Sequence, residues 1–210
     1  MTLVENGTHV LFGARLGSFA EGETTLAHAA LPALQPGMLC LADRQFFGQA
    51  LWQAAAATGA DLLWRVKRNL RLPREAVLAD GSYLTTIYPS EKDRRHKAAG
   101  VQVRVVEYRL ERIASAEPLY RLVTTILDPA AAPAAELAAL YPERWEIEGA
   151  LDELKTHLRG ARMVLRSKTP ELVGQEFRGL LLAHGACPPA AAGRPGGHSG
   201  PDARGGAARR

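Results

Sequence analysis

One segment of the chain places an acid, two bases and a phenol at helical spacing. Tyr141, Arg144, Glu148 and Lys155 are separated by three, four and seven positions. On a helix that advances about 100° per residue, these side chains lie within a stripe roughly 60° wide. An apolar stripe runs directly beside it, formed by Leu140, Ile147, Leu151, Leu154 and Leu158. A carboxylate that can bind a cation and two bases that can bind an anion are therefore expected along the edge of a buried helix face.

The same spacing also suits a purely structural role. Acids and bases at helical intervals are typical of a solvated face with weak ion pairs. Arg144 and Glu148 form an i,i+4 pair, and Tyr141 suits half-buried packing. The spacing alone leaves both interpretations open.

A second candidate is Asp43, which follows the wholly apolar run 38–42. Such a run is typical of a central strand that is buried on both faces. A side chain just after this strand clears the sheet edge, where open α/β sheets keep their binding sites. An aspartate in this position is also a common helix cap.

Both segments resemble the insertion-sequence-4 family of DDE transposases. The signature of that family is Tyr-x2-Arg-x3-Glu-x6-Lys, and the chain matches it at all four positions from Tyr141 to Lys155. The segment from Leu39 to Phe47 is similar to the second-aspartate motif of the family, and 59–67 continues the likeness. The resemblance covers roughly residues 1–183.

The resemblance implies an RNase H-like fold that cuts and joins DNA. Three carboxylates in such enzymes hold two Mg²⁺ ions about 4 Å apart, and oxygen ligands suit this hard cation. Asp43 and Glu148 are then the expected catalytic residues and metal ligands. Contacts with DNA are expected from five further residues, namely Tyr141, Arg144, Lys155, Arg65 and Lys67.

The resemblance also implies that part of the catalytic domain lies outside this chain. The first catalytic aspartate of the family belongs on a strand upstream of residues 2–5, and a domain that recognises transposon ends lies further upstream. We therefore expect a chain truncated at its N-terminus, without the first core strand and inactive in DNA cleavage and strand transfer. The alternative is a catalytically dead DNA-binding remnant that inhibits full-length transposase by mixing with it.

The order of predicted elements favours a mixed α/β sheet flanked by helices. Asn6-Gly7 predicts a hairpin between strands at 2–5 and 8–16. Helices at 23–34 and 46–58 alternate with strands at 38–42 and 62–67. A β-rich insertion is expected at about 72–128, with strands at 83–88, 101–108 and 119–127 and a basic loop at 92–97. Helices at 137–159 and 170–184 follow.

Composition sets broader limits. The chain of 210 residues is 47% hydrophobic and carries a net charge of +4, which suits a globular protein with a polyanionic partner such as DNA. A homodimer or a mixed dimer with full-length transposase is also expected. The two cysteines predict neither a disulfide framework nor a zinc site. With no signal peptide or membrane-length apolar run, we expect a cytoplasmic, nucleoid-associated protein that contacts no membrane.

The last 26 residues differ from the rest in composition. Residues 185–210 contain no Leu, Ile, Val or Phe and are rich in Gly, Ala, Pro and Arg. Such a segment buries too little apolar surface to offset its ordering entropy. We expect a partial catalytic domain over 1–184 and a disordered tail, which we interpret as translation of a shifted reading frame.

Overall fold

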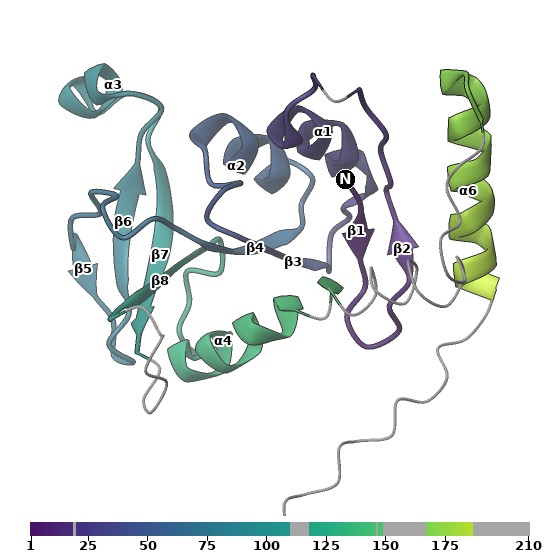
Figure 1. Ribbon diagram of the computed structural model, residues 1–210. Helices are drawn as coiled ribbons and strands as arrows, with labels where there is room; N and C mark the ends of the chain where they lie inside the picture. Colours follow the sequence, from purple (N-terminus) through teal and green to yellow (C-terminus); the bar gives the residue numbers. More distant parts are fainter. Residues whose placement is uncertain (19, 110–117, 146, 149–166, 187–210) are drawn as a thin grey trace, which may run out of the picture.

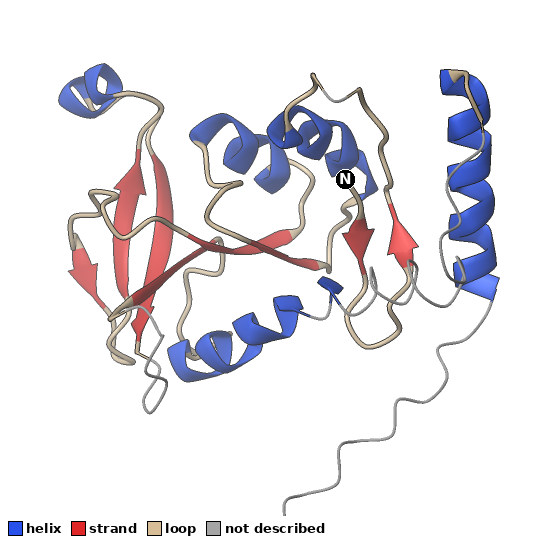
Figure 2. Cartoon of the chain, viewed as in Figure 1, coloured by secondary structure: helices blue, strands red, loops and turns tan. Residues whose placement is uncertain are grey.

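A six-stranded mixed sheet forms the centre of the computed structural model, which describes residues 1–18, 20–109, 118–145, 147–148 and 167–186. Its strand order is β3-β4-β8-β7-β6-β5, and a two-stranded sheet, β1-β2, lies beyond β3 (Figures 1 and 2). The strands are β1 (Leu3–Val4), β2 (Leu11–Phe12), β3 (Leu39–Ala42), β4 (Asp61–Arg65), β5 (Ala76–Val77), β6 (Tyr83–Ile87), β7 (Val101–Tyr108) and β8 (Tyr120–Thr124).

Helices cover both faces of the larger sheet. The α-helices are α1 (Glu23–Ala30), α2 (Gln49–Ala56), α3 (Glu91–His96), α4 (Ala134–Leu140) and α6 (Pro170–Ala186), and the 3₁₀ helices are η1 (Leu31–Ala33) and η2 (Tyr141–Trp145). Residues of η1 and α2 share a buried cluster with one sheet face, whereas α4 and η2 share a second cluster with the opposite face. This arrangement is the mixed sheet flanked by helices that the sequence predicts.

The predicted hairpin at Asn6-Gly7 is present. Leu3 pairs with Phe12 in antiparallel register, and Gly7 has a φ of 91° in the turn. The paired strands are shorter than the predicted ranges 2–5 and 8–16.

The order β-β-α-β-α-β is confirmed over residues 3–65, with β3 parallel to β4. The expectation that β3 is a central strand is not met. It lies at the edge of the six-stranded sheet, its four residues are only half-buried, and no strand in the described ranges pairs with its outer edge.

The core of the first face is built around two tryptophans. Trp52 of α2 is fully buried, and its ring meets that of Trp64 edge-on with 5.2 Å between centroids. Phe47 also packs against Trp52, with 5.7 Å between the ring centroids. These contacts fix α2 on β4, and thereby fix the loop that leads from β3 into α2.

The β-rich residues 76–124 extend the same sheet. The prediction of three strands in this part holds, since β7 runs from Val101 to Tyr108 and lies between β6 and β8. In turn β8 pairs antiparallel with β4, so the strands from β8 to β5 continue the sheet from β4.

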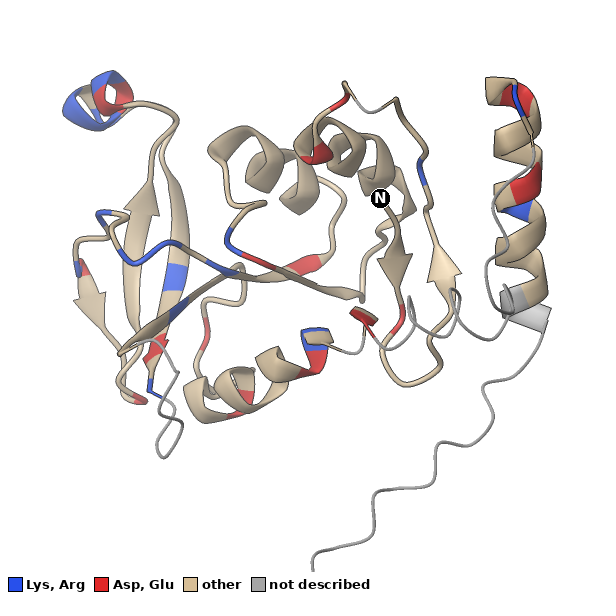
Figure 3. Cartoon of the chain, viewed as in Figure 1, with Lys and Arg blue, Asp and Glu red and all other residues tan. Residues whose placement is uncertain are grey.

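Two predictions of local structure are wrong. The expected basic loop at 92–97 is largely the helix α3, because the Ser90 side chain caps its start by accepting the Asp93 N–H at 3.1 Å. The charges of this helix are visible in Figure 3. The expected continuous helix at 137–159 is interrupted near its start, because α4 ends at Leu140 and η2 follows, and its part at 149–159 lies outside the described residues. Pro142 has no N–H for the next helical hydrogen bond, and its ring clashes with the preceding turn.

Candidate functional site

Asp43 lies just beyond the end of β3, as the sequence predicts. Its Oδ1 accepts the backbone N–H of Arg44 at 2.6 Å, and its side chain is about one-third exposed. The second oxygen, Oδ2, forms an ion pair with a terminal nitrogen of Arg144 at 3.8 Å.

Tyr141 joins η2 to the end of β3. Its hydroxyl donates to the carbonyl of Ala42 at 3.1 Å, and the residue is only 4% exposed. Burial raises the pKa of Tyr141, so the phenol stays neutral and acts as a donor. The packing role that the spacing left open is the one seen in this structure, and its contact with DNA stays a prediction.

Arg144 lies between Asp43 and Trp145. Its side chain is 15% exposed, and its guanidinium stacks on the ring of Trp145 at 4.5 Å from the centroid. Its Nε is buried and has no hydrogen-bond partner among the described residues. The guanidinium thus keeps hydrogen-bonding capacity for an acceptor that enters beside Asp43.

The other two residues of the signature are Glu148 and Lys155. Glu148 is exposed, and residues 147–148, which follow η2, are helical. Its convergence with Asp43 on one metal pair stays a prediction, and Lys155 lies outside the described residues. Side chains three positions apart eclipse in a 3₁₀ helix, so Tyr141 and Arg144 lie on one face of η2, with the Arg144 guanidinium 5.8 Å from the centroid of the Tyr141 ring.

Two of the expected DNA contacts follow β4. Arg65 is the last residue of β4. Because β3 and β4 are parallel, Arg65 lies at the same end of the sheet strands as Asp43. Its guanidinium lies over the Tyr120 ring at 4.6 Å, and that ring stacks on Tyr108. Lys67 is exposed two residues further on. Asp43, Arg65 and Arg144 therefore lie near one another at the carboxyl ends of β3 and β4.

A metal site is not complete within the part of the chain that the structure describes. No group of three His, Cys, Asp or Glu residues there is arranged to hold a metal ion. Asp43 supplies an oxygen ligand of the kind that Mg²⁺ prefers, and any further ligands must converge on it.

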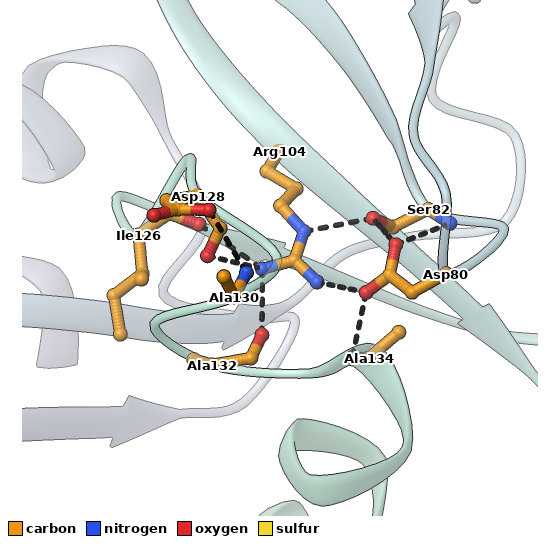
Figure 4. A network of polar contacts seen from close by, with 8 residues as sticks. All are labelled: Asp80, Ser82, Arg104, Ile126, Asp128, Ala130, Ala132 and Ala134. Atoms are coloured by element: carbon orange, nitrogen blue, oxygen red, sulfur yellow. Dashed lines mark hydrogen bonds and ion pairs between the residues drawn. The ribbon is translucent and has the colours of Figure 1, made fainter.

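A buried network around Arg104 was not predicted from the sequence (Figure 4). The Arg104 side chain is fully buried on β7, where its Nε donates to Ser82 Oγ at 2.8 Å and one terminal nitrogen donates to the Ala132 carbonyl at 2.7 Å. The other terminal nitrogen binds Asp80, whose Oδ2 also accepts the Ala134 N–H at 2.8 Å. The only signal was an arginine inside the apolar strand 101–108.

This network fixes the start of α4 on the sheet. Ala134 is the first residue of α4, and a carboxylate is favourable at a helix N-terminus. Because α4 leads directly into η2, the Arg104–Asp80 pair helps to place Arg144 against Asp43. Burial alone would raise the pKa of Asp80, but hydrogen bonds from Ser82 and Ala134 and the charge of Arg104 outweigh it and hold that pKa below its ordinary value.

The protein is therefore expected to lose stability in acid. A lowered pKa in the folded state means that Asp80 stabilises the fold above its unfolded pKa of about 4, and that this contribution is lost as pH falls through the folded value. Urea unfolding at pH 6 and pH 3 measures the loss. Asp80→Asn should lower stability at pH 6 and reduce the difference between the two pH values. An unchanged pH dependence in that variant would contradict the assignment.

Comparison with known proteins identifies the class. Residues 2–185 match the family described as "Transposase DDE domain", and the chain belongs to the DDE transposases. More narrowly, it belongs to the insertion-sequence-4 family. It is 30% identical over 183 residues to "Transposase InsG for insertion sequence element IS4" of Escherichia coli strain K12, an alignment that covers 86% of this chain and 41% of the relative. The chain thus spans about two fifths of the length of this relative.

Among the described residues, no helix has the length and apolar character needed to cross a membrane.

Proposed function

We propose that this chain is part of the RNase H-like catalytic domain of an insertion-sequence transposase, whose complete form cleaves DNA and transfers strands with the help of metal ions. The observation that carries the proposal is the contact between the two motifs. Arg144 lies 3.8 Å from Asp43, and Tyr141 binds the carbonyl of the preceding residue, Ala42. Segments about 100 positions apart in sequence therefore meet at one sheet edge.

In this proposal the residues divide into metal ligands and DNA contacts. Asp43 and Glu148 hold Mg²⁺, which when bound activates the attacking oxygen and stabilises the leaving oxygen. Arg144 and Lys155 bind phosphates near the cleavage site, the first in a forked geometry and the second as a point charge. Arg65 and Lys67 hold the DNA backbone near the same site, and Tyr141 positions Arg144 by fixing η2 against Ala42.

The proposal includes a third carboxylate, the first catalytic aspartate, on a core strand upstream of β1. Two Mg²⁺ ions close together repel strongly, and three carboxylates with the scissile phosphate offset that repulsion. With two carboxylates the metal pair is under-neutralised, and this chain is inactive by itself. The partial domain covers residues 1–184, with strands β5 to β8 as the inserted β-rich part at about 72–128.

The second candidate function is inhibition. The Arg65 and Arg144 side chains lie at the sheet edge whether or not the metal site is complete, so the chain retains groups that bind DNA phosphates. It would then mix with full-length transposase on DNA in the nucleoid and lower its activity.

A strand-transfer assay on pre-cleaved transposon ends with Mg²⁺ or Mn²⁺ tests the function. The 210-residue chain should not join DNA, whereas a version extended upstream through the missing aspartate should. In the extended protein, Asp43→Asn and Glu148→Gln should each reduce joining more than about 100-fold, since losing even a residue that only supports a ligand costs 10–100-fold. Glu136→Gln, which changes an exposed carboxylate of α4, is the matched control.

Three outcomes separate the candidates. Joining by the 210-residue chain that Glu148→Ala abolishes would show that a third ligand is already present. Full activity of the extended Asp43→Asn protein would refute the site. Adding the 210-residue chain to the active extended protein tests inhibition, and unchanged joining at excess would exclude it.

A further inference from the structure

A basic turn at residues 67–71 follows β4 and leads toward β5. Its three cations, Lys67, Arg68 and Arg71, are exposed and form no hydrogen bond or ion pair with any residue that the structure describes. The segment contains no acidic residue, and the connection between β4 and β5 is coloured largely as Lys and Arg in Figure 3. Uncompensated positive charge therefore faces solvent two residues beyond Arg65.

The backbone of the basic turn is fixed from below by Arg121 of β8. The Leu70 N–H donates to the Lys67 carbonyl at 3.0 Å and closes the turn. Nη1 of Arg121 donates to the carbonyls of Arg68 and Leu70, at 3.1 and 2.9 Å. A planar guanidinium presents its donors in a rigid fork, so it holds both carbonyls in one arrangement.

Glu107 of β7 in turn holds Arg121. The two residues are directly opposite in the pairing of β7 with β8, and Oε1 of Glu107 accepts from Nε of Arg121 at 2.8 Å. The same oxygen accepts from the Tyr83 hydroxyl at 3.0 Å. Oε2 accepts from Arg74, which follows the basic turn, at 2.8 Å. Glu107 thus fixes the basic turn through Arg121 and the chain just after it through Arg74.

The charges of this network leave the basic turn positive. Burial alone would raise the pKa of Glu107, but hydrogen bonds from Arg121, Tyr83 and Arg74 and the charge of Arg121 outweigh it and hold that pKa below its ordinary value. The ionised carboxylate faces two guanidinium groups, so it leaves no negative charge to neutralise the exposed cations. Such a surface is complementary to a polyanion.

We propose that the basic turn is a preformed contact for the phosphate backbone of DNA, and that Glu107 and Arg121 are positioning residues that hold it in shape. A segment that is ordered before binding loses less conformational entropy when it binds. Phosphate contacts carry no sequence information, so this binding is independent of sequence. The choice of DNA as the polyanion rests on the proposed function, whereas the positioning role rests on the contacts of Glu107 and Arg121.

Glu107→Gln gives opposite expected results for charge and for shape. The change makes the protein more positive, so a surface that acts through charge alone would bind DNA more tightly. If Glu107 positions the basic turn, binding at about 0.1 M salt should instead weaken about five- to tenfold, the loss of roughly one phosphate contact. Fluorescence anisotropy of a short labelled duplex of mixed sequence, without metal, measures the affinity of the 210-residue protein. Glu136→Gln makes the same change of charge at an exposed site on α4 and should not weaken binding.

The salt dependence of binding separates a lost contact from a folding defect. A folding defect lowers the fraction of protein that binds, whereas losing one phosphate contact makes the plot of log affinity against log salt shallower by about 0.9. Urea unfolding shows whether Glu107→Gln is folded under the binding conditions. If it is not, Arg121→Lys takes its place, because it keeps the charge and loses the fork, and it should weaken binding in the same way.

Arg71→Ala tests the contact itself, because it removes an exposed cation and leaves the network intact. The slope should again fall by about 0.9. Arg95→Ala is the matched control and should leave the slope unchanged. It removes an exposed arginine from α3, which joins β6 to β7 at the end of the sheet opposite the basic turn.

Three results would overturn the inference. They are tight binding by Glu107→Gln equal to that of Glu136→Gln, an unchanged slope in Arg71→Ala, and no binding by the parent protein at about 0.05 M salt. The joining assay is a separate test. If these variants weaken DNA binding as expected but the extended protein does not join DNA, only the proposed function fails.

Discussion

Replacing Arg104 by alanine is expected to lower the free energy of unfolding by about 3–5 kcal/mol, the usual cost of removing one partner of a buried ion pair. The change removes the charge that faces Asp80. It also removes the N–H donors that bind the Ala132 carbonyl and the Ser82 hydroxyl. Because the Arg104 side chain is fully buried, water does not replace these bonds without opening the fold. Urea unfolding followed by circular dichroism measures the change.

The controls for this prediction distinguish the network from general effects of charge. Arg109→Ala removes an exposed arginine directly after β7 and should change stability by less than about 0.5 kcal/mol. Arg104→Lys keeps the charge but loses the planar fork, so it should remain clearly destabilised. A loss below about 1 kcal/mol in Arg104→Ala would show that the network contributes little to α4 placement.

Replacing Trp52 by alanine in the otherwise unchanged protein is expected to lower the free energy of unfolding by about 3–5 kcal/mol, because it leaves a cavity between α2 and the sheet. The ring is fully buried and contacts Phe47 and Trp64. Trp52→Phe should cost much less, because the indole Nε1 has no hydrogen-bond partner among the described residues and its loss leaves no acceptor unpaired. The same urea measurement applies.

Val77→Ala is the control for loss of apolar volume, since Val77 is 67% exposed and its truncation should be nearly neutral. If Trp52→Phe were as damaging as Trp52→Ala, the indole N–H would have a partner, and the packing account would be wrong. The comparison also shows how firmly α2 holds the loop that carries Asp43.

Local sequence signals predicted the elements with strong and regular patterns. The turn at Asn6-Gly7, the apolar run that becomes β3 and the β-branched strand β7 all appear where expected. Each depends on neighbours within a few residues, so periodicity and turn chemistry suffice to find it. Asp43 and Arg144 were predicted from their motifs as site residues, and they lie 3.8 Å apart in the structure.

The features that the sequence did not reveal depend on competing local effects or on distant contacts. Pro142 interrupts a segment whose apolar pattern continues through it, so the sequence predicted one continuous helix where α4 ends at Leu140 and η2 follows. Arg104 meets Asp80 from 24 positions away and Ala132 from 28, and no periodicity encodes such partners. The edge position of β3 is a property of the whole sheet rather than of its four residues.

The pairing of β4 with β8 has a consequence for synthesis on the ribosome. Leu63 of β4 pairs with Thr124 of β8, 61 positions later (124 − 63). At about 5–20 residues per second, roughly 3–12 s pass before the partner strand emerges. During that time one side of the apolar strand β4 is unpaired, since of its two partner strands only β3 precedes it in the sequence. Nascent chains are thus most exposed to aggregation and to chaperones between the completion of β4 and the arrival of β8.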